Sequence, residues 1–148
     1  MREIKFRGKR KDNGEWAYGG LLAFENMSLI VSGSVLISHD STKPYSYLAS
    51  DFWDEVIPET VPETVGQYTG LKDCKRTEEY PEGQEIYEGD IVEGYKPCRN
   101  SFRSGTITYR PMMFEIVCCG GREKIKRLHS MTVVGNIHTN PELIGEVK

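Results

Sequence analysis

The segment Ile86–Val92 constrains the fold of this chain more than any other part of the sequence. It reads Ile-Tyr-Glu-Gly-Asp-Ile-Val, so strand-forming residues stand on both sides of a Gly-Asp pair. Glycine tolerates backbone conformations that other residues avoid, and a turn aspartate accepts hydrogen bonds from nearby backbone amides. The segment therefore predicts a strand that is interrupted by a tight turn or bulge at Gly89-Asp90.

Short runs of alternating apolar residues predict that the rest of the chain is mainly β as well. In the first half, Asp12-Asn13-Gly14 separates the runs 4–6 and 16–18, which is a hairpin pattern, and runs 29–31 and 35–37 suit two further buried strands. In the second half, about five short strands, among them 106–109, 112–118 and 131–137, favour a small curled barrel, because closure removes exposed strand edges.

One or two short helical turns are expected beside the strands. Asn140 can cap a turn that has Pro141 at its first position, where the missing amide hydrogen costs nothing. Ser50 or Asp51 can cap another turn that runs to Asp54, and a plain loop is the open alternative there. Residues 39–47 are polar and include a proline, so we expect a loop over that range.

The tetrapeptide Pro-Glu-Thr-Val occurs twice in succession, starting at Pro58 and at Pro62. Two prolines so close together favour an extended edge or linker conformation. We therefore expect the boundary between two regions here, with an N-terminal β-hairpin or meander region over residues 1–63 and a barrel module over residues 64–148.

Composition favours an intracellular globular protein. The longest apolar runs are a few residues, whereas a membrane-spanning helix needs about 20, and the N-terminus has no apolar core of a signal peptide. No pair among Cys74, Cys98, Cys118 and Cys119 has the C-x-x-C spacing of a zinc site. We expect reduced thiols, a cytoplasmic location and no membrane partner.

Charge is segregated along the chain. Basic residues gather in 1–11 and 96–127, and acidic residues gather in 51–63 and 78–93. The opposite charges could meet inside the fold or form separate basic and acidic faces, and the sequence leaves both open. A basic groove would suit single-stranded nucleic acid. The candidate contact residues are Arg99, Arg103, Arg110, Arg122, Lys124, Lys126 and Arg127, of which the last four equally suit a solvated strand edge.

No set of residues forms a recognisable active site. Asp90, beside Glu88, has no second group that the sequence places within reach, so a turn aspartate is the favoured interpretation. His39, His129 and His138 are far apart in sequence, and Cys118 lacks an identifiable partner beyond the distant His129. The aromatic residues Trp16, Tyr18, Tyr109 and Phe114 have strand spacing and are expected in the core. We expect no enzyme, no cofactor and no metal site.

Three segments together resemble the YopX family of bacteriophage and prophage proteins: Met1–Arg7, the central Thr64–Asp73 leading to Glu85–Val92, and the closing Val134–Leu143. Their order and approximate placement match over nearly the whole chain. The resemblance implies a phage or prophage origin and a β-rich fold with an SH3-like barrel in the second half. It implies no catalytic residues. The sequence departs from the family pattern between Asp73 and Glu85, where the family has a shorter turn.

The functional expectation follows from these observations together. We expect a non-enzymatic interaction module in the cytoplasm of a bacterial host, which binds a protein partner or a second copy of itself. The alternative is a nucleic-acid-binding protein that uses the basic segments 1–11 and 96–127.

Overall fold

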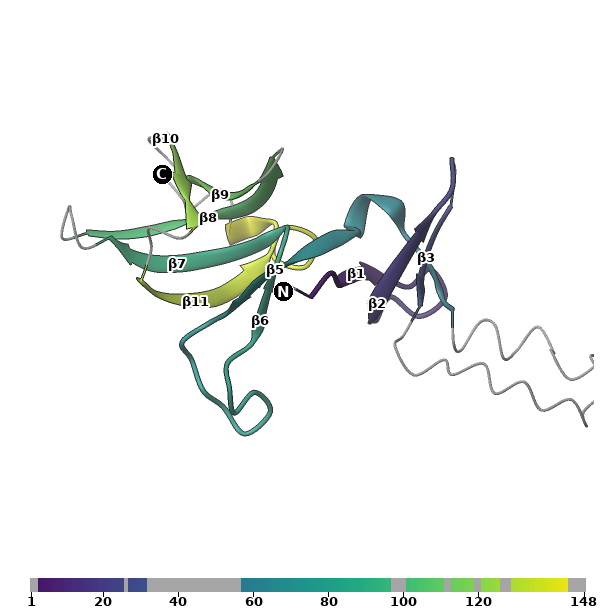
Figure 1. Ribbon diagram of the computed structural model, residues 1–148, viewed down its shortest axis with the longest axis horizontal. Coiled ribbons are helices and arrows are strands. Elements are labelled where there is room, and N and C mark those ends of the chain that lie inside the picture. The colour runs from purple at the N-terminus through teal and green to yellow at the C-terminus, as the bar shows by residue number, and fades with distance from the viewer. Residues whose placement is uncertain are drawn as a thin grey trace, which may run out of the picture. The chain divides into compact units, whose positions relative to one another are not determined.

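The computed structural model describes residues 3–25, 27–31, 57–96, 101–110, 113–118, 121–125 and 129–143. For residues 95, 96, 101–103 and 129 it describes the backbone alone. The described chain is mainly β, as predicted, and its strands pair antiparallel. It divides into two compact units, an N-terminal unit of Ile4–Gly66 and a C-terminal unit of Gln67–Lys148, to which Met1–Glu3 also belongs (Figure 1). Three expected features lie outside the described residues: strand 35–37, loop 39–47 and the helical turn at 50–54.

The described residues of the N-terminal unit form four strands in the order β4-β3-β2-β1, namely β1 (Phe6–Lys9), β2 (Trp16–Ala23), β3 (Ser28–Val31) and β4 (Glu59–Thr60). The predicted hairpin is confirmed, because β1 pairs with β2 and the turn between them is closed by the Gly14 amide, which donates to the Arg10 carbonyl. Strand β2 then pairs with β3 over Gly20–Ala23. The expected strand 29–31 is therefore also confirmed, as the greater part of β3.

Backbone hydrogen bonds close these four strands into a small ring. The Lys11 amide donates to the Glu59 carbonyl, and the Val61 amide donates to the Lys9 carbonyl, so β4 joins the end of β1 as well as β3. Thr60 is fully buried in the ring, and its hydroxyl donates to the Ser28 carbonyl. A Cβ placed on Gly8 would lie 3.0 Å from the Thr60 Cβ, so a side chain at position 8 would crowd Thr60.

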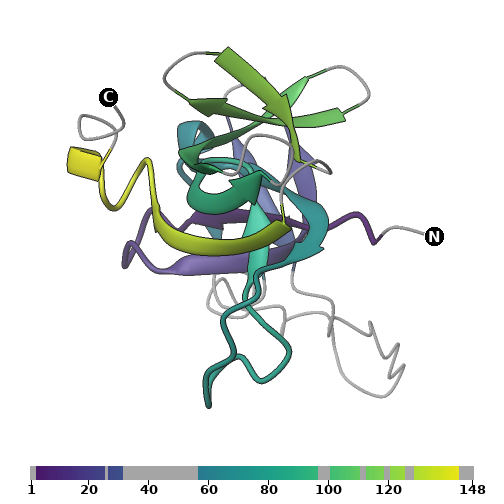
Figure 2. The same ribbon diagram turned by 90° about the vertical axis from the view of Figure 1, so that its left-hand side faces the viewer.

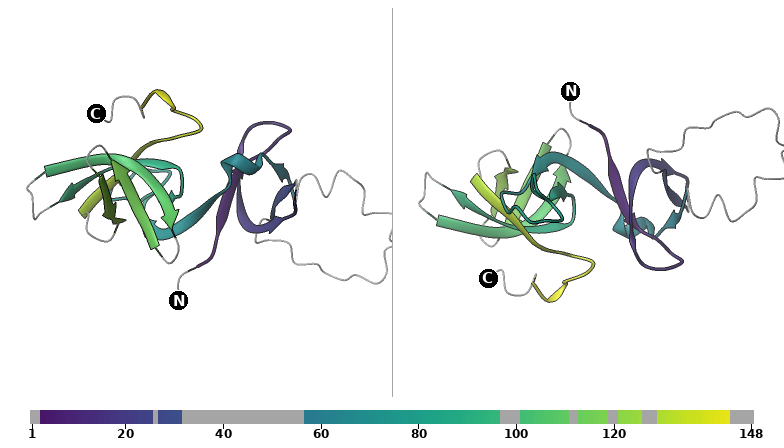
Figure 3. Two further views of the ribbon diagram at one scale, coloured as in Figure 1. Left: turned by 90° about the horizontal axis from the view of Figure 1, so that it is seen from above. Right: turned by 90° about the horizontal axis from the view of Figure 1, so that it is seen from below.

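The two Pro-Glu-Thr repeats take different conformations, which corrects the expectation that both are extended. The first repeat contributes β4, an extended strand of two residues. The second repeat forms the 3-10 helix η2 (Pro62–Thr64), with proline at its start, where no amide hydrogen is required. In both views of Figure 3 the short η2 ribbon, coloured teal, lies beside the purple strands of the same unit.

The C-terminal unit contains a strand pair and a five-stranded sheet. Strand β5 (Gly66–Lys72) pairs with β6 (Glu85–Tyr87). The sheet has the order β10-β9-β8-β7-β11, formed by β7 (Asp90–Lys96), β8 (Ser101–Arg110), β9 (Met113–Cys118), β10 (Gly121–Lys124) and β11 (His129–Asn136). Its strands bend along their length (Figure 2), and within the described residues the sheet forms a half-barrel. The strands expected at 112–118 and 131–137 are confirmed within one or two residues, and the strand expected at 106–109 is confirmed as part of the longer β8, which begins at Ser101.

The core of this unit lies on one face of the curved sheet. It is made of buried residues from β6, β7, β8, β9 and β11 and of the residue that follows β10: Ile86, Val92, Ile107, Phe114, Ile116, Met131 and Ile125. The expectation that strand-spaced aromatic residues are buried holds for Phe114. It is wrong for Tyr109, which packs on Phe114 with a centroid distance of 5.0 Å and is still 42% exposed. Tyr18 of the N-terminal unit has the same exposure.

The predicted interruption within 86–92 is confirmed as a turn. Strand β6 ends at Tyr87, Gly89 has a φ of 83°, and β7 begins at Asp90. The Gly89 amide donates to the Ile107 carbonyl of β8, and the Gly89 carbonyl accepts from the Ile137 amide just after β11. The turn therefore holds together segments that are distant in sequence. The helical residues expected near the C-terminus begin at Glu142.

Candidate functional site

Asp90 is buried and occupied by structural hydrogen bonds. The Asp90 residue as a whole is 1% exposed. Its Oδ2 accepts the Tyr87 amide at 2.7 Å, and its Oδ1 accepts the Asn136 side-chain amide at 3.2 Å. Both carboxylate oxygens are therefore used to fix the β6–β7 turn against β11. The geometry supports the turn interpretation over an acid or base role.

The other candidate reactive groups do not assemble into a described site. His39, Cys98 and Cys119 lie outside the described residues, and His129 is described by its backbone alone. The His138 amide donates to the Asn136 side chain, and the Cys118 thiol lies 3.5 Å from the Gly121 carbonyl that accepts from it. Within the described ranges, no group of three or more His, Cys, Asp or Glu side chains is arranged to hold a metal ion. No helix in those ranges is long and apolar enough to cross a membrane.

Three of the predicted basic contact residues share one face of the five-stranded sheet. Residues opposite each other in an antiparallel ladder project from the same face. Lys124 of β10 is opposite Glu115 of β9, and Glu115 is opposite Thr108 of β8. Because successive residues alternate, Arg122 and Arg110 project from that same face. We call Arg110, Arg122 and Lys124 the basic sheet face.

The basic sheet face is exposed and only partly neutralised. The Arg110 Nε lies 3.9 Å from the Glu115 Oε2, and Arg122 and Lys124 are solvent-exposed on the edge strand β10. The interpretation of this strand as a solvated edge agrees with its place at the end of the sheet. Arg99, Lys126 and Arg127 lie outside the described residues. Arg103 is described by its backbone alone, opposite Gly94 in the β7–β8 ladder.

The basic residues of the N-terminal segment mostly contact groups within their own unit. The Arg7 guanidinium lies over the Trp16 ring at 4.6 Å, and the Lys9 ammonium lies over the same ring at 5.6 Å. Cations in such positions are attracted to the ring face. Lys11 forms an ion pair with Glu59 of β4, which is one case of the basic and acidic segments meeting inside the fold.

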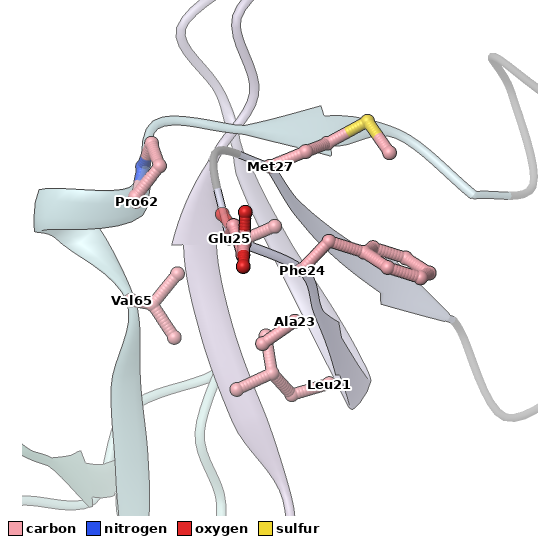
Figure 4. A pocket seen from close by; sticks show the side chains of 8 residues that line it. Leu21, Ala23, Phe24, Glu25, Met27, Pro62 and Val65 are labelled. Carbon is pink, nitrogen blue, oxygen red and sulfur yellow. The ribbon is translucent and has the colours of Figure 1, made fainter.

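The turn between β2 and β3 forms one side of an apolar pocket that the sequence interpretation missed (Figure 4). The pocket has a volume of about 230 Å³, and we call it the tip pocket. It is lined by Leu21, Ala23, Phe24, Glu25, Met27, Ser28, Pro62 and Val65. The Phe24 amide donates to the Met27 carbonyl at 2.8 Å, which closes the turn, while η2 brings Pro62 to the opposite wall.

Two large apolar side chains of the tip pocket are exposed. Phe24 is 61% exposed and Met27 is 37% exposed. A sequence signal existed, because these residues bracket the polar pair Glu25-Asn26 where a hairpin turn would normally be polar throughout. Their convergence with Pro62 could not be read from the sequence, since it depends on η2. A second pocket, of about 280 Å³, is lined by Lys11, Asp12, Pro58 and Glu59, and its charged walls are already paired.

The chain matches a known protein family. The family model described as YopX protein matches residues 5–145. No curated protein and no solved structure matches the chain. The match spans both units, including the turn at Gly89 and the tip pocket.

Proposed function

This chain belongs to the YopX protein family, and from that premise we propose that it is a binding protein without catalytic activity, which engages a protein partner through the tip pocket. The observation that carries the proposal is the exposure of Phe24 and Met27 around an open apolar pocket. Burial of such apolar surface by a partner stabilises the complex by about 25 cal/mol for each Å² removed from water. Clustered exposed apolar residues mark interaction sites more often than single ones do.

The chemistry of the described side chains supports binding over catalysis. The buried carboxylate Asp90 is committed to backbone and amide donors. Asp73 is committed in the same way, because its Oδ1 accepts the Gln84 amide and its Oδ2 accepts the Val133 amide. A general acid or base needs a carboxylate that can reach a substrate proton. We accordingly propose that the protein acts without a metal or other cofactor.

A pull-down with single variants tests the protein-binding function. The full chain, immobilised, is expected to retain a host protein, and Phe24→Ser should abolish that retention. The matched control is Val134→Ser on β11, which removes an apolar side chain that is 41% exposed and should leave retention unchanged. Because Phe24 is largely exposed and Val134 is partly exposed, each change should alter the free energy of unfolding by about 1 kcal/mol or less. Equal retention by all three proteins would refute the tip pocket as the binding site.

The second candidate function is nucleic-acid binding through the basic sheet face. The observation that favours it is that Arg110, Arg122 and Lys124 project from one face of the sheet. Lysine and arginine contacts to phosphates release counterions, so binding of this kind weakens steeply as salt rises.

Fluorescence anisotropy with single- and double-stranded oligonucleotides at low salt tests this candidate. Lys124→Glu should weaken binding, whereas Lys75→Glu, which makes the same charge change at an exposed position of the β5–β6 loop, should weaken it far less. Equal effects of the two variants would show a response to net charge alone. No binding at tens of micromolar would refute nucleic-acid binding through the basic sheet face.

We also propose a barrel fold for the second half of the chain, a phage or prophage origin and a cytoplasmic site of action. The curved five-stranded antiparallel sheet, with its core on one face, supports an SH3-like barrel for the second half of the chain. Membership of a family that resembles bacteriophage and prophage proteins supports a phage or prophage origin, from which we propose action in the cytoplasm of a bacterial host. An experimental structure compared with SH3 domains tests the barrel. A C-terminal sheet that opens flat, with its last strand turned away from the core, would refute it.

A further inference from the structure

We propose that the tip pocket receives one apolar side chain of a partner peptide that carries a lysine or arginine beside it, an inference that rests on the protein-binding function proposed above. Three properties of the pocket favour this occupant: its size, its few polar side chains, and the short turn that holds its charged and apolar groups together.

The size of the pocket selects a side chain over a small-molecule ligand. Pockets for cofactors and drug-sized ligands have volumes of about 300–1,000 Å³. The tip pocket, at about 230 Å³, is smaller than this range and open to solvent. Its walls are mainly aliphatic, aromatic and thioether groups, and methionine adapts its shape to different guests. An apolar anchor residue of a protein partner fits such a pocket, as central hot-spot residues do in known interfaces.

Among the described lining residues of the pocket, one polar side chain is available to a partner. The Ser28 hydroxyl is 2.9 Å from the Thr60 hydroxyl and also donates to the Thr60 carbonyl, so it is occupied inside the ring. Glu25 is exposed, and within the described part of the chain its carboxylate has neither a hydrogen bond nor an ion pair. Among the described lining residues there is no cation. The pocket therefore presents apolar surface with one negative charge, and the complementary partner presents an apolar side chain with one positive charge.

The spacing between the two groups is fixed by the turn. Phe24, Glu25 and Met27 belong to the same turn, which the Phe24–Met27 backbone hydrogen bond closes at 2.8 Å. Figure 4 shows the Glu25 carboxylate among the apolar side chains that surround the pocket. The cation of the partner must therefore lie within one or two residues of its apolar anchor.

Selection from a displayed library of random peptides tests the inference on the full chain. The wild-type protein should enrich peptides in which Leu, Ile, Met or Phe lies within two residues of Lys or Arg. Glu25→Lys should switch the selected charge, so that Asp or Glu accompanies the same apolar residues. Glu25→Gln should keep the apolar preference and lose the charge preference. Glu25 is exposed, so both variants should fold, which circular dichroism confirms independently.

A synthetic peptide from the selection, and its copy with norleucine in place of the basic residue, then provide affinities. The basic peptide should bind the wild type about two- to fivefold more tightly than the norleucine copy, as an exposed ion pair allows, and Glu25→Gln should remove that difference.

The possible failures of the inference and of the proposed function differ. Enriched peptides without a basic residue, or a charge preference that Glu25→Lys leaves unchanged, would overturn the inference and leave the binding function standing. Enrichment that survives Phe24→Ser would overturn the location of the site, and with it both proposals. Failure to enrich any peptide would overturn the peptide inference. If light scattering then shows a dimer that Phe24→Ser dissociates, the occupant of the pocket is a second copy of the chain.

Discussion

At the scale of single residues, burial and hydrogen bonding determine the role of each carboxylate in this protein. Asp90 and Asp73 are buried, and each uses both oxygens to hold a turn or loop in place. Glu82 is exposed and pairs with Lys72 across the β5–β6 loop. Glu25 is exposed beside apolar groups and has no partner within the described residues. Burial with satisfied hydrogen bonds indicates a structural carboxylate, and exposure next to apolar surface indicates one that is available for binding.

Replacing Asp90 with alanine should destabilise the protein substantially. The change leaves the Tyr87 amide without its acceptor and removes the Asn136 contact, both in a buried site. A buried donor that loses its partner costs about 1–3 kcal/mol, so Asp90→Ala should lower the free energy of unfolding by about 2–4 kcal/mol. Urea denaturation measures this. Glu93→Ala, at an exposed position of the same strand, should change it by about 0.5 kcal/mol or less. Similar midpoints for the two variants would contradict the role given to Asp90.

The ion pair between Lys72 and Glu82 should be visible in a carboxyl titration. The hydrogen bond from the Lys72 ammonium lowers the pKa of Glu82 below its ordinary value, and the charge of Lys72 acts in the same direction. Because the pKa is lowered in the folded state, the pair stabilises the protein above the unfolded-state pKa and loses that effect as pH falls through the folded pKa. Carbon-detected NMR of the Glu82 carboxyl should show a low midpoint that Lys72→Met raises. A midpoint that Lys72→Met does not move would show that the pair is absent in solution.

At the scale of elements, the sequence could predict some local structures and not others, and the two copies of Pro-Glu-Thr illustrate the difference. The hairpin at Asp12-Asn13-Gly14 and the turn at Gly89 were predictable, because each is determined by residues that are adjacent in sequence. The two Pro-Glu-Thr copies were not. Thr60 extends because it fills the ring and bonds to Ser28, whereas Thr64 turns because its hydroxyl reaches two backbone groups. Contacts with distant residues decided between the two conformations.

Thr64 should be a measurable link between η2 and β1. Its hydroxyl accepts the Lys9 amide at 2.8 Å and donates to the Val61 carbonyl at 2.7 Å. Thr64→Val keeps the shape and removes both bonds, so it should lower the free energy of unfolding by about 1–3 kcal/mol. Thr64→Ser keeps the hydroxyl and should recover most of that loss. If serine and valine are equally destabilising, the methyl group and not the hydroxyl holds η2 in place.

At the scale of the whole molecule, the sequence predicted which residues carry charge and which form strands, but not which faces they share. The pairing of β10 with β9 and of β9 with β8 brings three basic residues to one face of the sheet, namely Arg110, Arg122 and Lys124. The tip pocket depends likewise on the placement of η2. Charge segregation was visible along the chain, and Lys11–Glu59 shows one place where the fold joins opposite segments. Such pairing is non-local, so neither periodicity nor composition reveals it.

The described residues of the two units differ in how much apolar surface they bury, and the local stabilities of these parts should differ accordingly. The C-terminal unit has a continuous core that includes Ile107 and Ile116, both almost fully buried. Among the described residues of the N-terminal unit, Ile30 is the buried hydrophobic residue, and the other buried residues are Pro58, glycines and polar residues such as Ser28 and Thr60. Local opening requires least free energy where few apolar contacts are lost.

Native-state hydrogen exchange should therefore show the slowest amides in β7, β8 and β9 and faster exchange of the ladder amides in β1, β2 and β3. Ile107→Ala, which removes buried methyl and methylene groups, should reduce the protection of β7–β9 by about 2–5 kcal/mol. The control Val117→Ala changes a side chain that is 38% exposed on β9 and should reduce it much less. Equal protection of the two sets of strands in the wild type would mean that the polar ring is as cooperative as the apolar core, which would contradict the assignment of stability to buried apolar area.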